Sequence, residues 1–211
     1  MKIAEYIDST NVKPNAKKED IIKLCRDAVK YKFRGVCISP TWVKLAKQIL
    51  RKENIKVITV IGFPFGYSLT KEEETRKAVN DGVDEIDMVM NISAFKSKKY
   101  KFVEEDIKRV VKVAEGRNVK VIIECCYLNK EEKIKACKIA KRAGAKFVKT
   151  STGYGKWGAR LSDVRLMRKA FGEGVKAAGG IRTYEQALKF LKAGASVIGT
   201  STAVKIVRKI D

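Results

Sequence analysis

The sequence predicts an α/β protein that folds as a single (β/α)8 TIM barrel spanning residues 1–211. Three observations predict this fold class. Strand-like and helix-like segments alternate along the whole chain, they form eight pairs, and the length of 211 residues lies near the lower limit of about 200 for this fold. No G-x-G-x-x-G motif follows the first strand, which removes support for an open dinucleotide-binding sheet.

The expected strands are short runs of β-branched and apolar residues that end at Gly or at polar residues. In chain order they cover residues 6–8, 35–39, 56–63, 85–90, 120–126, 146–153, 174–178 and 197–201. Their spacing leaves room for a helix after each one, so we expect parallel pairing with right-handed crossovers.

The expected helices are the charged segments between these strands, in which apolar residues recur at helical spacing. They cover residues 18–31, 41–50, 70–81, 101–114, 130–143, 161–171 and 183–193, and a last helical turn begins near Thr202. Thr70 stands where a helix N-cap is expected, while Gly144 and Gly194 end two of the helices.

The active groups of such a barrel lie at the carboxyl ends of its strands, so polar residues there are the candidate site residues. They are Asp8, Thr10, Asp87, Glu124, Lys149, Ser151, Lys176 and the segment 199–202.

The formal net charge of +22, from 46 Lys and Arg against 24 Asp and Glu, suggests by itself an anionic partner such as nucleic acid. The basic residues are nevertheless spread over nearly every helical segment and mixed with acidic ones. No dense basic stripe, zinc finger or RNA-binding aromatic motif is present. We therefore interpret the charge as the solvated surface of a heat-adapted protein and expect no nucleic-acid partner.

Cysteine and histidine usage narrows the chemistry further. The five cysteines show no C-x-x-C spacing and there is no histidine, so we expect buried reduced thiols, no metal site, and no Ser-His or Cys-His catalytic pair. Lysine and carboxylate must then carry any catalysis. The apolar runs are strand-sized and the first residues lack the features of a signal peptide, so we expect a cytoplasmic protein with no membrane span.

Lys149 lies in the middle of an expected strand, on one face with Phe147 and Ser151. An ammonium group among such neighbours loses hydration, which lowers its pKa and yields a free amine able to form a Schiff base. The alternative is a lysine at a strand end whose alkyl stem carries the charge out to solvent.

Asp87 and Lys176 are the expected partners of this amine. Asp87 shares a strand face with Glu85, whereas the other face of that strand is apolar, so both carboxylates should point into the barrel. A salt bridge that closes the barrel layers is the alternative role for them. Lys176 lies on the strand next to that of Lys149, at a spacing of about 4.8 Å. Each ammonium disfavours the charge of the other.

Two glycine-containing segments, 179–183 and 199–202, follow the seventh and eighth strands. A Gly-Gly pair alone is more often a simple turn. At this position in a barrel, however, backbone N–H groups commonly bind phosphate. The sequence therefore predicts a phosphorylated carbonyl compound as substrate.

With these residues assembled, the chain resembles the deoxyribose-phosphate aldolases, a family of class I (Schiff-base) aldolases. The resemblance runs almost end to end. It is carried by I-D-x-T at 7–10 with K-P at 13–14, V-I-G-F-P at 60–64, D-E-I-D-M-V at 84–89, V-I-I-E at 121–124, F-V-K-T-S-T-G at 147–153 and V-K-x-x-G-G-I-R-T at 175–183.

The resemblance implies reversible cleavage of 2-deoxy-D-ribose 5-phosphate to D-glyceraldehyde 3-phosphate and acetaldehyde, with no metal or organic cofactor. Lys149 would form the Schiff base, Lys176 would lower its pKa, and Asp87 would assist proton transfer through water. The supporting polar residues would be Asp8, Thr10 and Thr150, and the phosphate would be bound by Gly153, Gly179, Gly180, Ser201 and Thr202. We also expect a homo-oligomer, either a dimer or a tetramer.

The chain departs from the family pattern at Ser9, at Ala178 and at Lys156-Trp157, and it ends at Asp211 without the tyrosine-bearing tail of some members. Two rival functions remain open. One is a Schiff-base barrel aldolase for a different sugar phosphate, and the other is a basic, non-catalytic barrel that binds nucleic acid.

Overall fold

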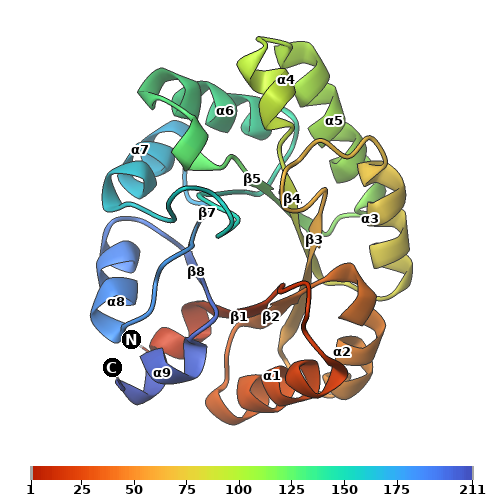
Figure 1. The fold of residues 1–211 in the computed structure, drawn as a ribbon, viewed down its shortest axis with the longest axis vertical. Helices are drawn as coiled ribbons and strands as arrows, with labels where there is room; N and C mark the ends of the chain where they lie inside the picture. Colours follow the sequence, from red (N-terminus) through yellow and green to blue (C-terminus); the bar gives the residue numbers. More distant parts are fainter. Residues whose placement is uncertain (1, 211) are drawn as a thin grey trace.

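The computed structural model describes residues 2–210 as a closed barrel of eight parallel strands in the order β1 to β8, with β8 returning to pair with β1. Figure 1 shows the helices arranged around this barrel, and the predicted (β/α)8 fold is confirmed. The predicted domain also includes Met1 and Asp211, which lie outside the described residues.

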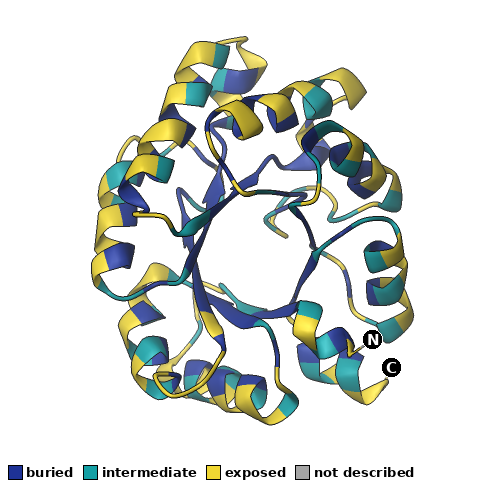
Figure 2. Ribbon diagram, turned by 180° about the vertical axis from the view of Figure 1, so that it is seen from behind, coloured by how far each residue is buried: buried dark blue, intermediate teal, exposed yellow. Residues whose placement is uncertain are grey.

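The strands are short and largely buried. They are β1 (Ile7–Asn11), β2 (Gly35–Ile38), β3 (Lys56–Ile61), β4 (Glu85–Val89), β5 (Asn118–Ile122), β6 (Phe147–Lys149), β7 (Val175–Ala178) and β8 (Val197–Thr200). In Figure 2 they form a dark, buried ring, as expected for a parallel sheet that helices cover from outside.

The helices cover the barrel, with buried residues toward the strands and exposed residues toward solvent (Figure 2). The α-helices are α1 (Lys18–Tyr31), α2 (Val43–Ile49), α3 (Lys71–Asn80), α4 (Ile92–Lys96), α5 (Tyr100–Val113), α6 (Lys130–Arg142), α7 (Leu161–Phe171), α8 (Tyr184–Lys192) and α9 (Ala203–Arg208). Three 3-10 turns complete the chain: η1 (Ile3–Tyr6), η2 (Pro40–Trp42) and η3 (Cys125–Tyr127).

The barrel interior is divided into an apolar part and a charged part. Cys37, Ile58 and Val60 form a small buried apolar cluster of their own, on β2 and β3. Charged side chains from β1 and from β4 to β7 occupy the rest of the interior. The larger apolar core lies between the strands and the helices, and residues such as Ile86 and Met88 from the opposite face of β4 belong to it.

Several predicted boundaries differ from the structure. The sixth strand was expected to reach residue 153 but ends at Lys149; the backbone of Thr150 still pairs with Lys176, whereas the N–H of Thr152 donates to the side chain of Glu124. The fifth strand begins two residues earlier than expected and gives way to the turn η3. Helix α4 was not predicted; it is a five-residue helix that Asn91 caps by accepting from the N–H of Ala94.

Thr70 occupies the N-cap position of α3 as predicted, but its side chain makes no capping hydrogen bond. The hydroxyl instead lies near Ser68 and Glu74. The five cysteines are buried free thiols, as predicted. Within residues 2–210, no helix is long and apolar enough to cross a membrane.

Candidate active site

Charged side chains from non-adjacent strands meet inside the barrel. Asp87 on β4 is contacted by Lys149 on β6 and by Lys176 on β7, with Nζ to Oδ2 distances of 2.9 and 2.8 Å. Asp8 on β1 contacts Lys176 at 2.6 Å. In the barrel wall, β5 separates β4 from β6 and β7, and β8 separates β7 from β1. These contacts therefore cross the interior. Lys149 and Lys176 therefore point to the same side of the wall.

A second set of ion pairs lies beside the first. Lys120 on β5 contacts Oε2 of Glu85 at 2.6 Å and Oδ1 of Asp87 at 3.1 Å. Arg34, just before β2, donates to Oδ1 of Asp8 at 2.8 Å and to Oε1 of Glu85 at 2.7 Å. Every carboxylate in the interior therefore has at least two cationic partners.

The electrostatics of these pairs holds the carboxyl groups ionised. Burial acts to raise the pKa of Asp87, but Lys120, Lys149 and Lys176 around it hold that pKa well below its usual range. Burial likewise opposes ionisation of Glu85, yet the neighbouring Lys120 and Arg34 lower its pKa to about 2. Asp8 behaves in the same way, its pKa being lowered by Lys176 and Arg34 against the effect of burial.

Lys176 keeps its proton for the complementary reason. Burial by itself would lower the pKa of this lysine, but the two carboxylates of Asp8 and Asp87 outweigh it and raise the pKa above the usual value. Lys176 is completely buried. It is therefore a fixed ammonium group beside Lys149.

Lys149 differs from the other interior lysines in its access to solvent. Its ammonium contacts Asp87, while its side chain, 4% exposed, lines a cavity of about 530 Å³ at the carboxyl ends of the strands. Lys120 and Lys176 are wholly buried and do not line this cavity. A molecule that enters from solvent therefore meets the amine of Lys149.

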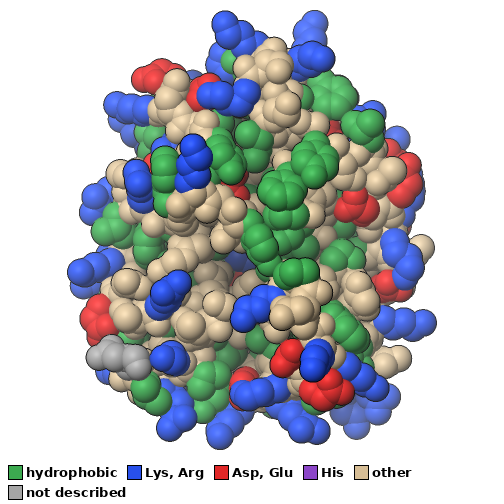
Figure 3. All heavy atoms as spheres, in the orientation of Figure 1, with side chains coloured by type: hydrophobic (Ala, Val, Ile, Leu, Met, Phe, Trp, Pro, Cys, Tyr) green, Lys and Arg blue, Asp and Glu red, His purple; other side chains and the backbone are tan. Residues whose placement is uncertain are grey.

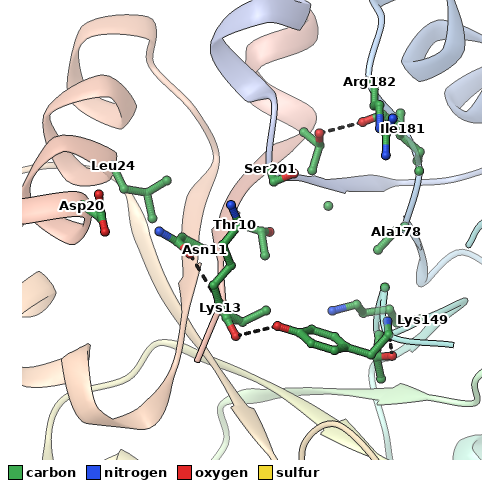
Figure 4. Close-up of a pocket in the computed structure, with 18 of the residues that line it drawn as sticks. Thr10, Asn11, Lys13, Asp20, Leu24, Lys149, Ala178, Ile181, Arg182 and Ser201 are labelled. Carbon is green, nitrogen blue, oxygen red and sulfur yellow. Dashed lines mark hydrogen bonds between the residues drawn. The ribbon is translucent and has the colours of Figure 1, made fainter. Parts of the chain in front are cut away.

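The wall of the cavity opposite Lys149 is made by the loops after β7 and β8. Gly179, Gly180, Arg182 and Ser201 line it, and Figure 4 shows Ser201 and Arg182 across the cavity from Lys149. Gly179 and Gly180 both have positive φ, 92° and 77°, a conformation that L side chains rarely adopt. A Cβ at Gly179 would also come within 2.9 Å of the Cα of Gly158.

Glu124 supports the loop that closes a third side of the cavity. This buried residue follows β5, and its Oε2 accepts from both the N–H and the hydroxyl of Thr152. Thr152 and the next residue, Gly153, line the cavity. Glu124 thus ties the β6 loop to the end of β5.

The chain that carries this site is also similar to known proteins along nearly its whole length. A family model described as "DeoC/LacD family aldolase" matches residues 3–209. The chain belongs to this aldolase family. A curated relative named deoxyribose-phosphate aldolase, from Thermococcus kodakarensis, is 61% identical over 213 residues, which cover 97% of this chain and 95% of the relative.

More distant members agree. A relative of the same name from Streptococcus sanguinis is 50% identical, and the match covers 99% of this chain and 96% of the relative. Among solved structures, the tetrameric deoxyribose phosphate aldolase from Aeropyrum pernix superposes with a TM-score of 0.91 at 34% identity, over 98% of this chain and 89% of that one.

The structure brings together most of the residues that the sequence predicted for this aldolase site. Lys149 and Lys176 both contact Asp87 inside the barrel. The predicted ligand-binding residues that line the cavity are Thr10, Gly153, Gly179, Gly180 and Ser201.

Three predicted substrate-binding residues lie elsewhere. Asp8 is wholly buried beneath the cavity, where it pairs with Lys176 and Arg34. Thr150 is also buried, and its hydroxyl donates to the carbonyl of Ala178 while accepting from the Ala178 N–H. Thr202 does not line the cavity; its hydroxyl donates to the carbonyl of Arg182. In the structure these three residues hydrogen-bond or pair with other parts of the site, and their predicted contact with substrate stays a prediction.

Sequence reasoning missed Lys120, Arg34 and Arg182. Lys120 opens the expected fifth strand, and its alternation with Ile122 could have placed it inward in the same way as Lys149. Arg34 precedes the second strand, where a basic residue is expected in solvent, and no pattern in the sequence indicates its two buried partners. Arg182 stands in the quoted G-G-I-R-T motif and lines the cavity.

Proposed function

We propose that residues 1–211 act as one aldolase domain that reversibly cleaves 2-deoxy-D-ribose 5-phosphate to D-glyceraldehyde 3-phosphate and acetaldehyde, through a Schiff base on Lys149. The observation that carries this proposal is the position of Lys149: it is the interior lysine that lines the cavity, and the glycine-rich loops face it. The names of the curated relatives support the choice of substrate.

In the first step, the unprotonated amine of Lys149 attacks the aldehyde carbon of the open-chain sugar. The resulting carbinolamine loses water to give a protonated Schiff base. Asp87, whose Oδ2 lies 2.9 Å from the Lys149 nitrogen, is placed to accept and return protons through a water molecule. Lys176, held as an ammonium by two carboxylates, favours the uncharged form of a neighbouring amine.

In the second step, the Schiff base accepts the electron pair of the breaking C2–C3 bond as the C3 hydroxyl loses its proton. This releases D-glyceraldehyde 3-phosphate and leaves the enamine of acetaldehyde on Lys149. Protonation of the enamine at C2, followed by hydrolysis, frees acetaldehyde and restores the amine. The steps need only a nitrogen nucleophile, proton transfer and the water that is released in the first step and taken up again in the hydrolysis.

The phosphate group would bind at the wall made by Gly179, Gly180 and Ser201, where backbone N–H groups can approach an anion. Arg182 on the same wall adds a cation. Anchoring the phosphate there, across the cavity from Lys149, places the aldehyde end of the sugar toward the amine (Figure 4).

Three further expectations belong to the same proposal. We expect a cytoplasmic enzyme that has no nucleic-acid partner and that assembles as a homo-oligomer, a dimer or a tetramer. The description of a related aldolase as tetrameric supports the last of these.

The proposal is tested by trapping with acetaldehyde and cyanoborohydride, followed by peptide mass spectrometry, together with an assay of 2-deoxyribose 5-phosphate cleavage. We expect ethylation of Lys149 in the wild type. In Lys149→Met we expect loss of that label and a fall in cleavage of roughly a thousandfold or more, because Lys13 and Lys23, the other lysines that line the cavity, are exposed and are not paired with Asp87. Lys108→Met removes a surface lysine and should behave as the wild type.

A panel of sugar phosphates and a nucleic-acid binding assay separate the rival functions. Turnover of a different sugar phosphate, with 2-deoxyribose 5-phosphate inert, would support the other Schiff-base aldolase. Salt-sensitive binding of DNA or RNA that survives Lys149→Met, with no cleavage of any sugar phosphate, would support the nucleic-acid binder.

A further inference from the structure

Six charged side chains inside the barrel form a closed ring in which cations and anions alternate. The ring passes from Arg34 to Asp8, Lys176, Asp87, Lys120, Glu85 and back to Arg34, and its six contacts measure 2.8, 2.6, 2.8, 3.1, 2.6 and 2.7 Å in that order. Its members come from β1, β4, β5 and β7 and from the residue before β2.

The charges of this ring cancel. It contains three cations and three carboxylates, and Lys149 is attached outside it, through Oδ2 of Asp87. When Lys149 is protonated, the barrel interior carries one positive charge too many. When Lys149 loses its proton, the interior is neutral. Because unbalanced charge is costly away from water, the charge of Lys149 is coupled to the charges of the ring.

The other groups around Lys149 do not change this count. Cys37 on β2 lies with its sulfur 3.9 Å from Oδ2 of Asp87, and burial followed by the nearby carboxylate raises the pKa of its thiol, so it is neutral. Lys56 approaches Glu85 only to 3.6 Å, and its side chain is 47% exposed, so water screens its charge. Asn118, which donates to Glu85, is uncharged.

Lys120 has a place in this ring that no other residue fills. It joins the carboxylate of Asp87 to that of Glu85, and it does so through Oδ1 of Asp87. The other oxygen, Oδ2, is thereby left to face both Lys149 and Lys176. Lys120 is wholly buried and does not line the cavity, so it acts on the reaction through Asp87.

We propose that Lys120 is a positioning residue of this aldolase, which orients Asp87 and supplies the third cation that makes Lys149 the one surplus charge of the barrel interior. The inference rests on the proposed function, because it concerns the amine that forms the Schiff base. It adds that the pH at which Lys149 reacts is set by the charge count of the whole ring, so removal of a ring cation and removal of a ring anion have opposite effects.

The test compares Lys120→Met, Glu85→Gln and the double variant Lys120→Met/Glu85→Gln with the wild type. Lys108→Met serves as a matched control, since it removes the same charge from the surface of α5. For each protein, the rate of Lys149 ethylation by acetaldehyde and cyanoborohydride is followed over a pH series by peptide mass spectrometry. Far-UV circular dichroism at each pH confirms that the barrel is folded.

We expect the pH midpoint of labelling to rise by about one unit in Lys120→Met, because the ring then carries a surplus carboxylate that retains the Lys149 proton. The midpoint should fall by about one unit in Glu85→Gln, where a surplus cation expels that proton. The double variant restores the balance, so its midpoint should return to that of the wild type. Lys108→Met should leave the midpoint unchanged.

Midpoints that move in the same direction in both single variants, or that stay in place in folded proteins, overturn the role of Lys120. If Lys120→Met does not fold, Glu85→Gln and the double variant still decide, since the proposal requires a lower midpoint in the first and a restored one in the second. If the wild type shows no Lys149 adduct at any pH, the proposed function itself is wrong. If the wild type is labelled normally but the pH midpoints of the variants do not shift, only the proposed role of the charge ring is contradicted, and the proposed function stands.

Discussion

Three lysines with the same chemistry lie within one barrel, and their surroundings separate their roles. Lys176 forms ion pairs with Asp8 and Asp87, while Lys120 forms ion pairs with Glu85 and Asp87. Lys149 has one carboxylate neighbour and a side that faces the cavity. A nucleophile needs access and a labile proton, and of the three only Lys149 has the access.

Glu85 gives the residue scale its pH-dependent prediction. Its pKa in the folded protein is about 2, below the ordinary value of 4.5. A lowered carboxyl pKa contributes stability that is fully present above pH 4.5 and is lost as the pH falls through 2. The difference between the two pKa values corresponds to roughly 3 kcal/mol in the free energy of unfolding. We therefore expect Glu85→Gln to be less stable than the wild type at neutral pH, because Arg34 and Lys120 lose their shared partner.

The measurement is thermal unfolding of both proteins over a pH series. The gap between their Tm values should be constant above about pH 5 and should shrink toward pH 2, since a glutamine cannot titrate. A gap that stays constant down to pH 2 would mean that the Glu85 ion pairs do not stabilise the fold.

Residue patterns predicted Lys149, Asp87 and Lys176 because each lies on a strand whose alternation sets the direction of its side chain. The same rule applies to Lys120, but a lysine at the start of a strand is usually solvated. Lys120 was therefore not predicted as a site residue. Arg34 lies outside any periodic element. Its long side chain reaches Asp8 on β1 and Glu85 on β4, and only the tertiary structure brings residues of these two strands to it.

At the scale of elements, the type and order of every predicted strand and helix were right, and the errors lie at the ends and in α4. Strand β6 does not continue to residue 153, and the N–H of Thr152 donates to the side chain of Glu124 in place of a backbone carbonyl. Helix α4 has only five residues, too few for an apolar period to be visible. Local competition between side chains and backbone decides such ends, and periodicity does not record it.

Helices α3 and α5 are joined by a buried ion pair that makes a second prediction possible. The ammonium of Lys71 lies 2.5 Å from Oδ2 of Asp106, with side chains 1% and 9% exposed. Burial is the largest influence on Lys71 and lowers its pKa, although Asp106 opposes this. Removal of one partner leaves the other charge buried and unpaired, so we expect Lys71→Met to cost about 3 kcal/mol in the free energy of unfolding.

Chemical denaturation of Lys71→Met, Asp106→Leu and the double variant tests this interaction. The double variant replaces the pair by apolar side chains, so it should recover most of the loss seen in either single variant. Losses that simply add in the double variant would show that the two residues stabilise the protein independently.

At the scale of the whole molecule, the charge of +22 is spread over the surface. Figure 3 shows Lys and Arg side chains around the whole outline, with fewer acidic ones between them. Exposed pairs such as Lys23–Asp27 on α1 and Arg76–Glu72 on α3 each contribute little. The surplus of cations therefore dominates the surface electrostatics, and self-repulsion among them opposes the compact state.

This surplus predicts that salt stabilises the protein. Raising potassium chloride from about 0.01 M to about 0.1 M shortens the screening length from about 30 to about 10 Å, which weakens repulsion between separated surface charges more than attraction within close pairs. We expect the Tm to rise by about 3 °C, the shift produced by roughly 1 kcal/mol in a protein of this size.

The matched variant is Lys52→Glu/Lys146→Glu, in which each exposed reversal changes the charge by two and the total falls from +22 to +18. Its salt-dependent rise should be smaller, because less repulsion remains to be screened. A Tm that falls with salt in the wild type would instead show that the surface ion pairs outweigh the repulsion, and that the excess of lysine is balanced by local pairing with acidic neighbours.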